Sequence, residues 1–218
     1  MHGTGTAFNL TVAQPKTWII AQTDPKSRHY AASQQNLVTT LAAARVWSWP
    51  VDIWPAVDGW TMDAAAWDRI GVTLLPRGAI QKRPGARGCF HSHFGIWSWC
   101  VEHECSAVIL EHDAKITGPW PTDINLEQNI WKLHKPDGRG DRVNDYTGLW
   151  SCGAWAYTVT ALQAQRLVEF SRNVGAQAVD KQIGTQVVPW AYYASNLVVH
   201  SPRVTSTTSP KDPRLLDK

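Results

Sequence analysis

Three consecutive side chains that could bind a metal follow an apolar run in the middle of the chain. Glu111, His112 and Asp113 come directly after residues 107–110, whose sequence AVIL predicts a buried strand. Side chains alternate along an extended segment, so the carboxylates of Glu111 and Asp113 should project to the same side. Two close carboxylates repel each other unless a proton or cation intervenes, and oxygen ligands suit Mg²⁺ or Mn²⁺. The spacing indicates a divalent-metal site, and the alternative interpretation is a solvated turn at a strand end.

A second cluster upstream contains soft metal ligands. Cysteine and histidine are the side chains that bind zinc most often, and six of them fall close together: Cys89, His91, His93, Cys100, His103 and Cys105. Their spacings, C-x-H-x-H and C-x2-H-x-C, lack the paired rhythm of known zinc modules, and cysteine and histidine on a helix are more often packing residues. The cluster still supports one alternative hypothesis, a zinc-stabilised nucleic-acid-binding module without catalysis.

Composition bounds the class of protein. The 218 residues carry a formal net charge of +3 and four cysteines, and no apolar run approaches the roughly 20 residues that span a bilayer. The N-terminal residues lack a basic leader followed by an apolar block, so we expect a cytoplasmic protein without a transmembrane segment and with reduced thiols. Residues 76–88 hold Arg77, Lys82, Arg83 and Arg87 without an acid, which favours either an anionic ligand nearby or a solvated loop.

Strand and helix patterns alternate along the chain. Apolar, β-rich segments at 16–23, 51–60, 107–110 and 149–160 predict strands, and segments at 24–44, 61–72, 92–105 and 161–173 predict helices. Ser92 is the expected N-cap of the third helix, Gly71 the expected end of the second. The polar stretch 117–145 is typical of a long loop over a site.

This alternation predicts one α/β domain. We expect a mostly parallel central sheet flanked by helices, in which ligands bind beyond the carboxyl ends of the strands. The expected bounds are a flexible N-terminal segment at 1–15, a single domain at 16–200, and an extended or mobile tail at 201–218, which is rich in Ser, Thr and Pro.

One long segment, GARGCFHSHFGIWSWCVEHECSAVILEHD, resembles the central block of glycosyltransferase family 25, which includes lipooligosaccharide and collagen-type galactosyltransferases. That block carries Gly-Cys, then Ser-His, then a helix and a strand ending in Leu-Glu-Asp-Asp. This chain has Gly88-Cys89, Ser92-His93 and then LEHD at 110–113 in the same order. The segment WPAVDGW is similar to the family's Ala-Val-Asp-Gly turn, and weaker likenesses extend the resemblance over most of residues 16–209. His112 departs from the pattern by replacing the middle acid, so it would either point elsewhere or add an imidazole ligand.

The resemblance implies a GT-A-like single domain that moves a hexose from a UDP-sugar to a hydroxyl acceptor, a glycan or lipid-linked lipooligosaccharide, with inversion at the anomeric carbon. It implies a divalent cofactor, Mn²⁺ or Mg²⁺, bound by Glu111 and Asp113 with His112 beside them. The residues that it implies for the nucleotide sugar are Gln22, Arg28, Ala56, Val57, Asp58, Gly59, Arg87, Ser92 and His93. Inversion requires a general base on the acceptor side, for which Asp180 is the first candidate and Asp145 the second.

Thirteen tryptophans are many for this length. Indole rings stack on sugars and on nucleobases. Three tryptophans lie in apolar segments and are expected in the core: Trp18, Trp97 and Trp155. Three others border the polar stretch 117–145 and are expected at an acceptor cleft: Trp120, Trp131 and Trp150. Together with the basic stretch, they support a second alternative, a glycosyltransferase acting on hydroxymethylated bases in DNA, which would have to reach its base out of the stack.

Overall fold

The computed structural model describes residues 14–75, 79–136, 138 and 140–200. The predicted tail 201–218 and Arg77 lie outside the described residues, as does most of the predicted N-terminal segment 1–15. Within the described residues, every helix is too short or too polar to span a membrane.

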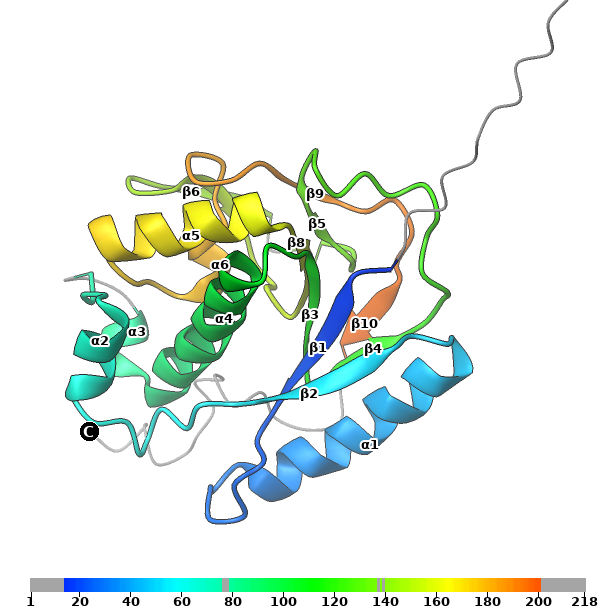
Figure 1. The fold of residues 1–218 in the computed structure, drawn as a ribbon, viewed down its shortest axis with the longest axis horizontal. Helices are drawn as coiled ribbons and strands as arrows, with labels where there is room; N and C mark the ends of the chain where they lie inside the picture. Colours follow the sequence, from blue (N-terminus) through cyan, green and yellow to red (C-terminus); the bar gives the residue numbers. More distant parts are fainter. Residues whose placement is uncertain (1–13, 76–78, 137, 139, 201–218) are drawn as a thin grey trace, which may run out of the picture.

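Six helices and ten strands form the described part of the chain (Figure 1). In chain order they are β1 (Lys16–Ala21), α1 (Tyr30–Val46), β2 (Val51–Pro55), α2 (Ala65–Ile70), α3 (Ala79–Lys82), α4 (Pro84–Glu102), β3 (Ala107–Glu111), β4 (Ala114–Ile116), β5 (Ile130–Lys132), β6 (Asp141–Asn144), β7 (Gly148–Ser151), β8 (Ala156–Val159), α5 (Ala161–Asn173), α6 (Val179–Gln182), β9 (Trp190–Tyr192) and β10 (Val198–His200).

The central sheet has six strands in the order β2-β1-β3-β8-β5-β9. β1 runs parallel to β2 and β3, and β9 runs parallel to β5, whereas β8 is antiparallel to both of its neighbours. Two further pairs, β4 with β10 and β6 with β7, stand beside it. The predicted class is therefore confirmed: an α/β fold with a mostly parallel central sheet flanked by helices.

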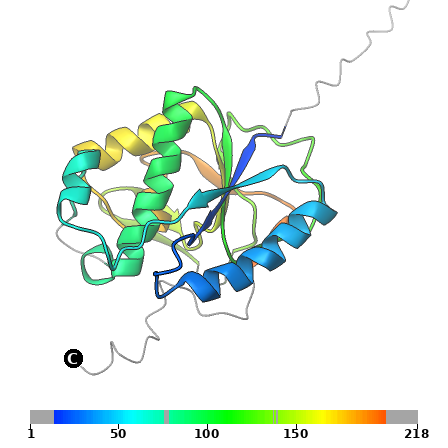
Figure 2. The ribbon, with the colours of Figure 1, turned by 60° about the horizontal axis from the view of Figure 1, so that its bottom comes forward.

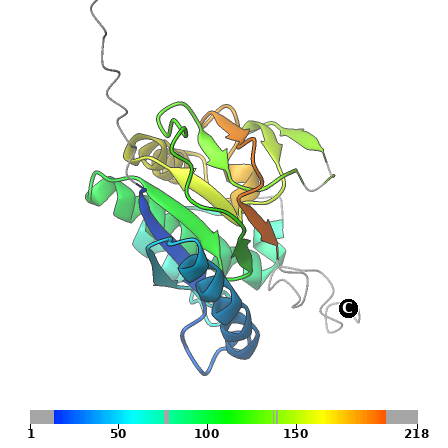
Figure 3. The same ribbon diagram turned by 90° about the vertical axis from the view of Figure 1, so that its right-hand side faces the viewer.

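Both faces of this sheet are buried because its strands alternate between two cores. In β3, Ala107 and Ile109 belong to the core beneath α4 and α5, whereas Val108 and Leu110 belong to the core beneath α1. Figures 1 and 2 show α1 and α4 on opposite faces, and Figure 3 shows α1 in front of the strands. Continuous apolar runs such as AVIL are the expected sequence of strands that are covered on both sides.

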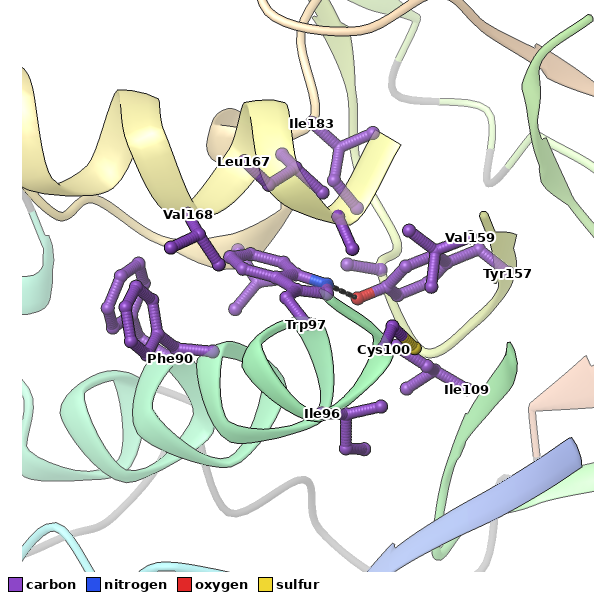
Figure 4. Packing of buried hydrophobic residues seen from close by; sticks show 14 of the residues in the cluster. Phe90, Ile96, Trp97, Cys100, Ile109, Tyr157, Val159, Leu167, Val168 and Ile183 are labelled. Carbon is purple, nitrogen blue, oxygen red and sulfur yellow. Dashed lines mark hydrogen bonds between the residues drawn. The ribbon is translucent and has the colours of Figure 1, made fainter. Parts of the chain in front are cut away.

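The core on the α4 side surrounds a pair of aromatic side chains (Figure 4). Trp97 of α4 and Tyr157 of β8 are both fully buried, and the Trp97 indole N–H donates a hydrogen bond to the Tyr157 hydroxyl oxygen at 2.9 Å. Leu167 and Val168 of α5 and Ile183 pack around them. The prediction that Trp97 is a core residue is confirmed, and this packing fixes α4 against the sheet.

The start of α4 differs from the prediction. The helix begins at Pro84, inside the segment expected to be a basic loop, so Ser92 lies in the helix interior and is not its N-cap. Proline is well suited to the first turn of a helix because its missing N–H needs no partner there. Lys82 likewise ends a short helix, α3. The loop prediction was wrong because it relied on the Pro, Gly and Arg content of the segment and not on the ability of proline to begin a helix.

The stretch 117–145 is also more ordered than predicted. It contributes β5 to the central sheet, and Ile130 and Leu133 are fully buried. The single strand expected at 149–160 is instead two strands, β7 and β8, separated at Gly153, whose φ of 91° lies in the region that favours glycine. Short strands within polar sequence lack the apolar alternation that would indicate them.

Candidate functional site

A pocket lies at the carboxyl ends of β1, β2 and β3. The empty space in it is about 570 Å³, part of which is open to solvent. Five parts of the chain contribute its walls: the end of β1, the start of α1, the turn after β2, one face of α4 and the end of β3. β1 lies between β2 and β3. The helix that leads into β2, α1, and the helix that leads into β3, α4, cover opposite faces of the sheet. Such a position is where ligands bind in open α/β sheets.

Most of the residues predicted for nucleotide-sugar and metal binding meet in this pocket. The predicted residues that line it are Gln22, Ala56, Val57, Asp58, Gly59, Ser92, His93, Glu111 and His112. The remaining predicted residues, Arg28, Arg87, Asp113, Asp145 and Asp180, are not among its lining. His29, Ser33 and Trp60 also line it and were not predicted, because nothing in their sequence spacing distinguishes them.

Hydrogen bonds hold the turn after β2 against α4. The Ser92 hydroxyl accepts a hydrogen bond from the Val57 backbone N–H at 2.9 Å and donates one to the Gly88 carbonyl at 2.8 Å. The Asp58 carboxylate accepts hydrogen bonds from the Ser27 hydroxyl at 2.6 Å and the Trp60 backbone N–H at 2.9 Å. Asp58 therefore shapes the turn, and the wall of the pocket is preorganised.

The two predicted arginines have different positions. Arg28 is exposed, with its guanidinium 4.7 Å from the ring centroid of Trp60, a pocket residue, which places a cation at the rim. Arg87 instead donates hydrogen bonds to the backbone carbonyls of Ile80, at 3.0 Å, and Gln81. Its guanidinium therefore stabilises α3 and the start of α4.

Glu111 is in contact with two side chains of α4. Its Oε1 lies 3.6 Å from Cys89 Sγ and 3.5 Å from His93 Nε2. The three ligand atoms all lie within 4.8 Å of one another, and within the part of the chain that the structure describes they are the one such group of Cys, His and acidic side chains. Glu111 continues the alternation of Ala107 and Ile109, so it faces α4.

Asp113 does not continue that alternation, because β3 ends at Glu111 and the chain turns through His112 into β4. The Asp113 carboxylate is 2% exposed and accepts a hydrogen bond from His200 Nε2 of β10 at 2.9 Å. Desolvation raises the pKa of Asp113, but this hydrogen bond and the nearby histidine charges outweigh it and lower the pKa. The expectation that Glu111 and Asp113 project together from one extended strand was wrong for this reason.

Mg²⁺ and Mn²⁺ prefer several oxygen ligands. Of the three predicted ligands, Glu111 alone joins a group of converging ligand atoms, and its neighbours there are a thiol and an imidazole. These residues do not fit an oxygen-rich divalent-metal centre, and dependence on Mn²⁺ or Mg²⁺ stays a prediction from resemblance.

Burial and the neighbouring acidic groups both act on the Cys89 thiol in the pocket. Desolvation raises the pKa of the Cys89 thiol well above its usual value, and the charges of Glu111 and Asp180 raise it further. Without a cation the thiol is therefore protonated at neutral pH. Asp180, on the short helix α6, is therefore close enough for its charge to act on a side chain that lines the pocket.

Other predicted residues lie elsewhere. Asp145 is exposed in the turn between β6 and β7. Trp150 is 5% exposed, and Arg142 and Lys181 lie over its ring, so it cannot offer an open stacking face. Trp120 and Trp131 are partly buried.

The six soft ligands do not gather into one zinc cluster. Cys89 and His93 belong to the group with Glu111, whereas His91 packs against Trp67 and His103 stacks on Trp99. Cys100 is fully buried in the core, and its free thiol forms a hydrogen bond with the Cys105 thiol. The helical periodicity of α4 separates these side chains around its circumference, so the ligand set of the zinc-module hypothesis is split.

No protein-family model matches this chain, and a search of curated proteins finds no significant match.

Proposed function

We propose that this protein is a GT-A-like glycosyltransferase that moves a hexose from a UDP-sugar to a hydroxyl acceptor. The observation that supports the proposal is the pocket at the carboxyl ends of β1, β2 and β3. Residues from three separate sequence segments line one cavity there: the turn at 56–59 and Ser92-His93, predicted as donor contacts, and Glu111, predicted as a metal ligand.

The walls of the pocket suit a nucleotide. The turn at 56–59 is held rigid by Ser92, so it offers a fixed edge for a uracil ring. Trp60 and His29, whose ring centroids are 4.9 Å apart, provide aromatic surface for a base or a sugar. Arg28 lies over Trp60 and supplies positive charge for a diphosphate.

Transfer of the hexose leaves negative charge on the departing diphosphate and requires removal of a proton from the acceptor hydroxyl. Arg28 is the described cation at the rim of the pocket that could stabilise the leaving group. Asp180 is the proposed general base, because it is a half-buried acid whose charge acts on the Cys89 thiol of the pocket. An acceptor glycan or lipid-linked sugar would approach between them.

The test is calorimetric titration of the protein with UDP, UDP-glucose and UDP-galactose, each with and without Mn²⁺. The variant Ala56→Phe fills part of the pocket, and Ala42→Phe makes the same change on the exposed side of α1. We expect the protein to bind UDP and one UDP-sugar. Ala56→Phe should weaken this affinity at least about tenfold, which corresponds to about 1.4 kcal/mol, and Ala42→Phe should leave it unchanged. Absence of binding to all three compounds by a folded protein would refute the proposal.

Activity is tested next with the donor that binds, by following release of UDP in the presence of glycan acceptors and of duplex DNA containing hydroxymethylated bases. Release that needs a glycan and is abolished by Asp180→Asn supports the assigned acceptor class and base. If release of UDP instead requires the modified DNA, the acceptor is a hydroxymethylated base and not a glycan. Full release by Asp180→Asn would exclude Asp180 as the base.

A further inference from the structure

We propose that Cys89, His93 and Glu111 form a binding site for a transition metal of the zinc class at the floor of the pocket. Cys89 and His93 are four residues apart on α4, so they lie on the same face of the helix, and Glu111 projects toward them from the end of β3. All three residues line the pocket. The site rests on these three side chains and does not depend on sugar transfer.

Two of the three separations between ligand atoms match those of a tetrahedral centre. With zinc bonds of about 2.3 Å to sulfur and about 2.0 Å to nitrogen and oxygen, tetrahedral ligands lie about 3.5 Å apart for sulfur and oxygen and about 3.3 Å apart for nitrogen and oxygen. The observed separations are 3.6 Å between Cys89 Sγ and Glu111 Oε1 and 3.5 Å between His93 Nε2 and Glu111 Oε1. The nitrogen–oxygen separation is long for a hydrogen bond to a carboxylate.

His93 provides a second, independent observation. Its side chain is fully buried, and Nε2 has no hydrogen-bond partner among the described residues although it faces Glu111. The other ring nitrogen, Nδ1, lies 2.8 Å from the Tyr157 hydroxyl, which also accepts the hydrogen bond from Trp97. A histidine ligand is commonly oriented by a hydrogen bond at its second nitrogen, which leaves the first nitrogen for the metal.

The donor set selects the class of metal. One thiolate, one imidazole and one carboxylate suit Zn²⁺ and Co²⁺ and disfavour Mg²⁺, which prefers oxygen ligands. Three protein ligands leave a fourth position, and all three of these side chains line the pocket, so a molecule bound in the pocket would be close to the metal. Zinc sites of this kind bind water or an oxygen atom of a ligand at the open position. We therefore expect a phosphate or hydroxyl oxygen of the pocket's ligand to bind there.

The experiment uses Co²⁺ as a spectroscopic probe. The full-length protein is purified, stripped with a chelator and titrated with Co²⁺ while the absorption spectrum is recorded. We expect one equivalent to bind, with the thiolate-to-cobalt charge-transfer band and the strong visible bands of a tetrahedral centre. Zn²⁺ should displace the Co²⁺, and a hundredfold excess of Mg²⁺ should not. Adding inorganic phosphate should change the visible bands if the fourth position is open.

Matched variants decide which side chains bind. Cys89→Ser should abolish the charge-transfer band, and Cys105→Ser, which changes a partly exposed thiol outside the group, should retain it. His93→Gln should weaken Co²⁺ binding at least tenfold. Circular dichroism and thermal unfolding check that each variant is folded.

Two results would overturn the proposal: folded wild-type protein that binds no Co²⁺, or a charge-transfer band that survives Cys89→Ser. Either would leave the contacts of Glu111 as a hydrogen bond and an ion pair. The calorimetric titration with UDP, repeated on the chelator-stripped protein, is a separate measurement, so loss of the metal site and loss of the proposed function are distinguishable.

Discussion

The backbones of Gly59 and Gly88 are packed in direct contact. A Cβ atom on Gly88 would lie 2.7 Å from the Gly59 nitrogen, and one on Gly59 would lie 2.8 Å from the Gly88 nitrogen. Gly59 belongs to the turn after β2. Gly88 lies four residues before Ser92 on α4, and the Ser92 hydroxyl accepts a hydrogen bond from Val57 in the turn that contains Gly59. The wall of the pocket thus depends on two positions without side chains.

Replacing Gly88 with alanine should destabilise the protein. The added Cβ would press on the Gly59 nitrogen and, more closely, on the Val57 carbonyl, both of which are backbone atoms that cannot rotate away. Overpacking of this kind costs about 1–3 kcal/mol, and the better helix propensity of alanine offsets up to about 1 kcal/mol. Urea unfolding measures the difference. Gly118→Ala is the control, since its Cβ would meet only the Leu197 side chain at 3.5 Å. Equal stability of the two variants would contradict the packing.

Ser92→Ala should cost roughly 1–2 kcal/mol, because the Val57 backbone N–H loses its acceptor at the edge of the pocket. The same substitution at Ser98, on the same helix, is the control. The Ser98 hydroxyl is buried and has no hydrogen-bond partner among the described residues, so its removal should be neutral or slightly stabilising. Chemical denaturation of both variants checks the prediction, and a larger loss from Ser98→Ala would refute it.

Segments with local signals could be predicted from sequence. The helix expected at 161–173 is α5, and it begins with a reciprocal pair of hydrogen bonds between Thr160 and Gln163, a pattern visible in the sequence as Thr-x-x-Gln. The end of α2 at Gly71, with a φ of 66°, was also expected. Such features depend on residues that are close together in the chain, so they can be recognised from a single sequence.

Features that depend on distant partners could not be predicted. The Asp113 carboxylate is bound by His200, which belongs to β10, the strand that pairs with β4 some 80 residues later. Tyr157, which supports His93, carries no local signal of that role. Short-range patterns give the strand that ends at Glu111, but the orientation of the side chains beyond it is set by tertiary contacts.

The phenol of Tyr193 should ionise late and depend on Asp123. Its hydroxyl donates a hydrogen bond to the Asp123 carboxylate at 2.6 Å, and desolvation followed by this contact raises the pKa of Tyr193 to about 12. Because the folded-state pKa exceeds the usual 10, the contribution to stability is present below pH 10 and is lost as the pH rises toward 12. NMR titration of the Tyr193 ring carbon bonded to oxygen should give a lower pKa in Asp123→Asn. An unchanged pKa would exclude Asp123 as a cause.

Tyr157→Phe tests the support behind the proposed metal site. Removing the hydroxyl leaves the Trp97 indole N–H without its acceptor and His93 Nδ1 without its partner, in a fully buried environment. Unsatisfied buried groups cost about 1–3 kcal/mol each, so a loss of about 2 kcal/mol or more is expected in urea unfolding. Tyr146→Phe, at an exposed tyrosine in the turn after β6, should leave the stability unchanged.

If His93 also binds a metal, Tyr157→Phe should weaken Co²⁺ binding about 10- to 100-fold, because the imidazole loses the contact that orients it. Reduced stability with unchanged Co²⁺ affinity would make Tyr157 a packing residue alone.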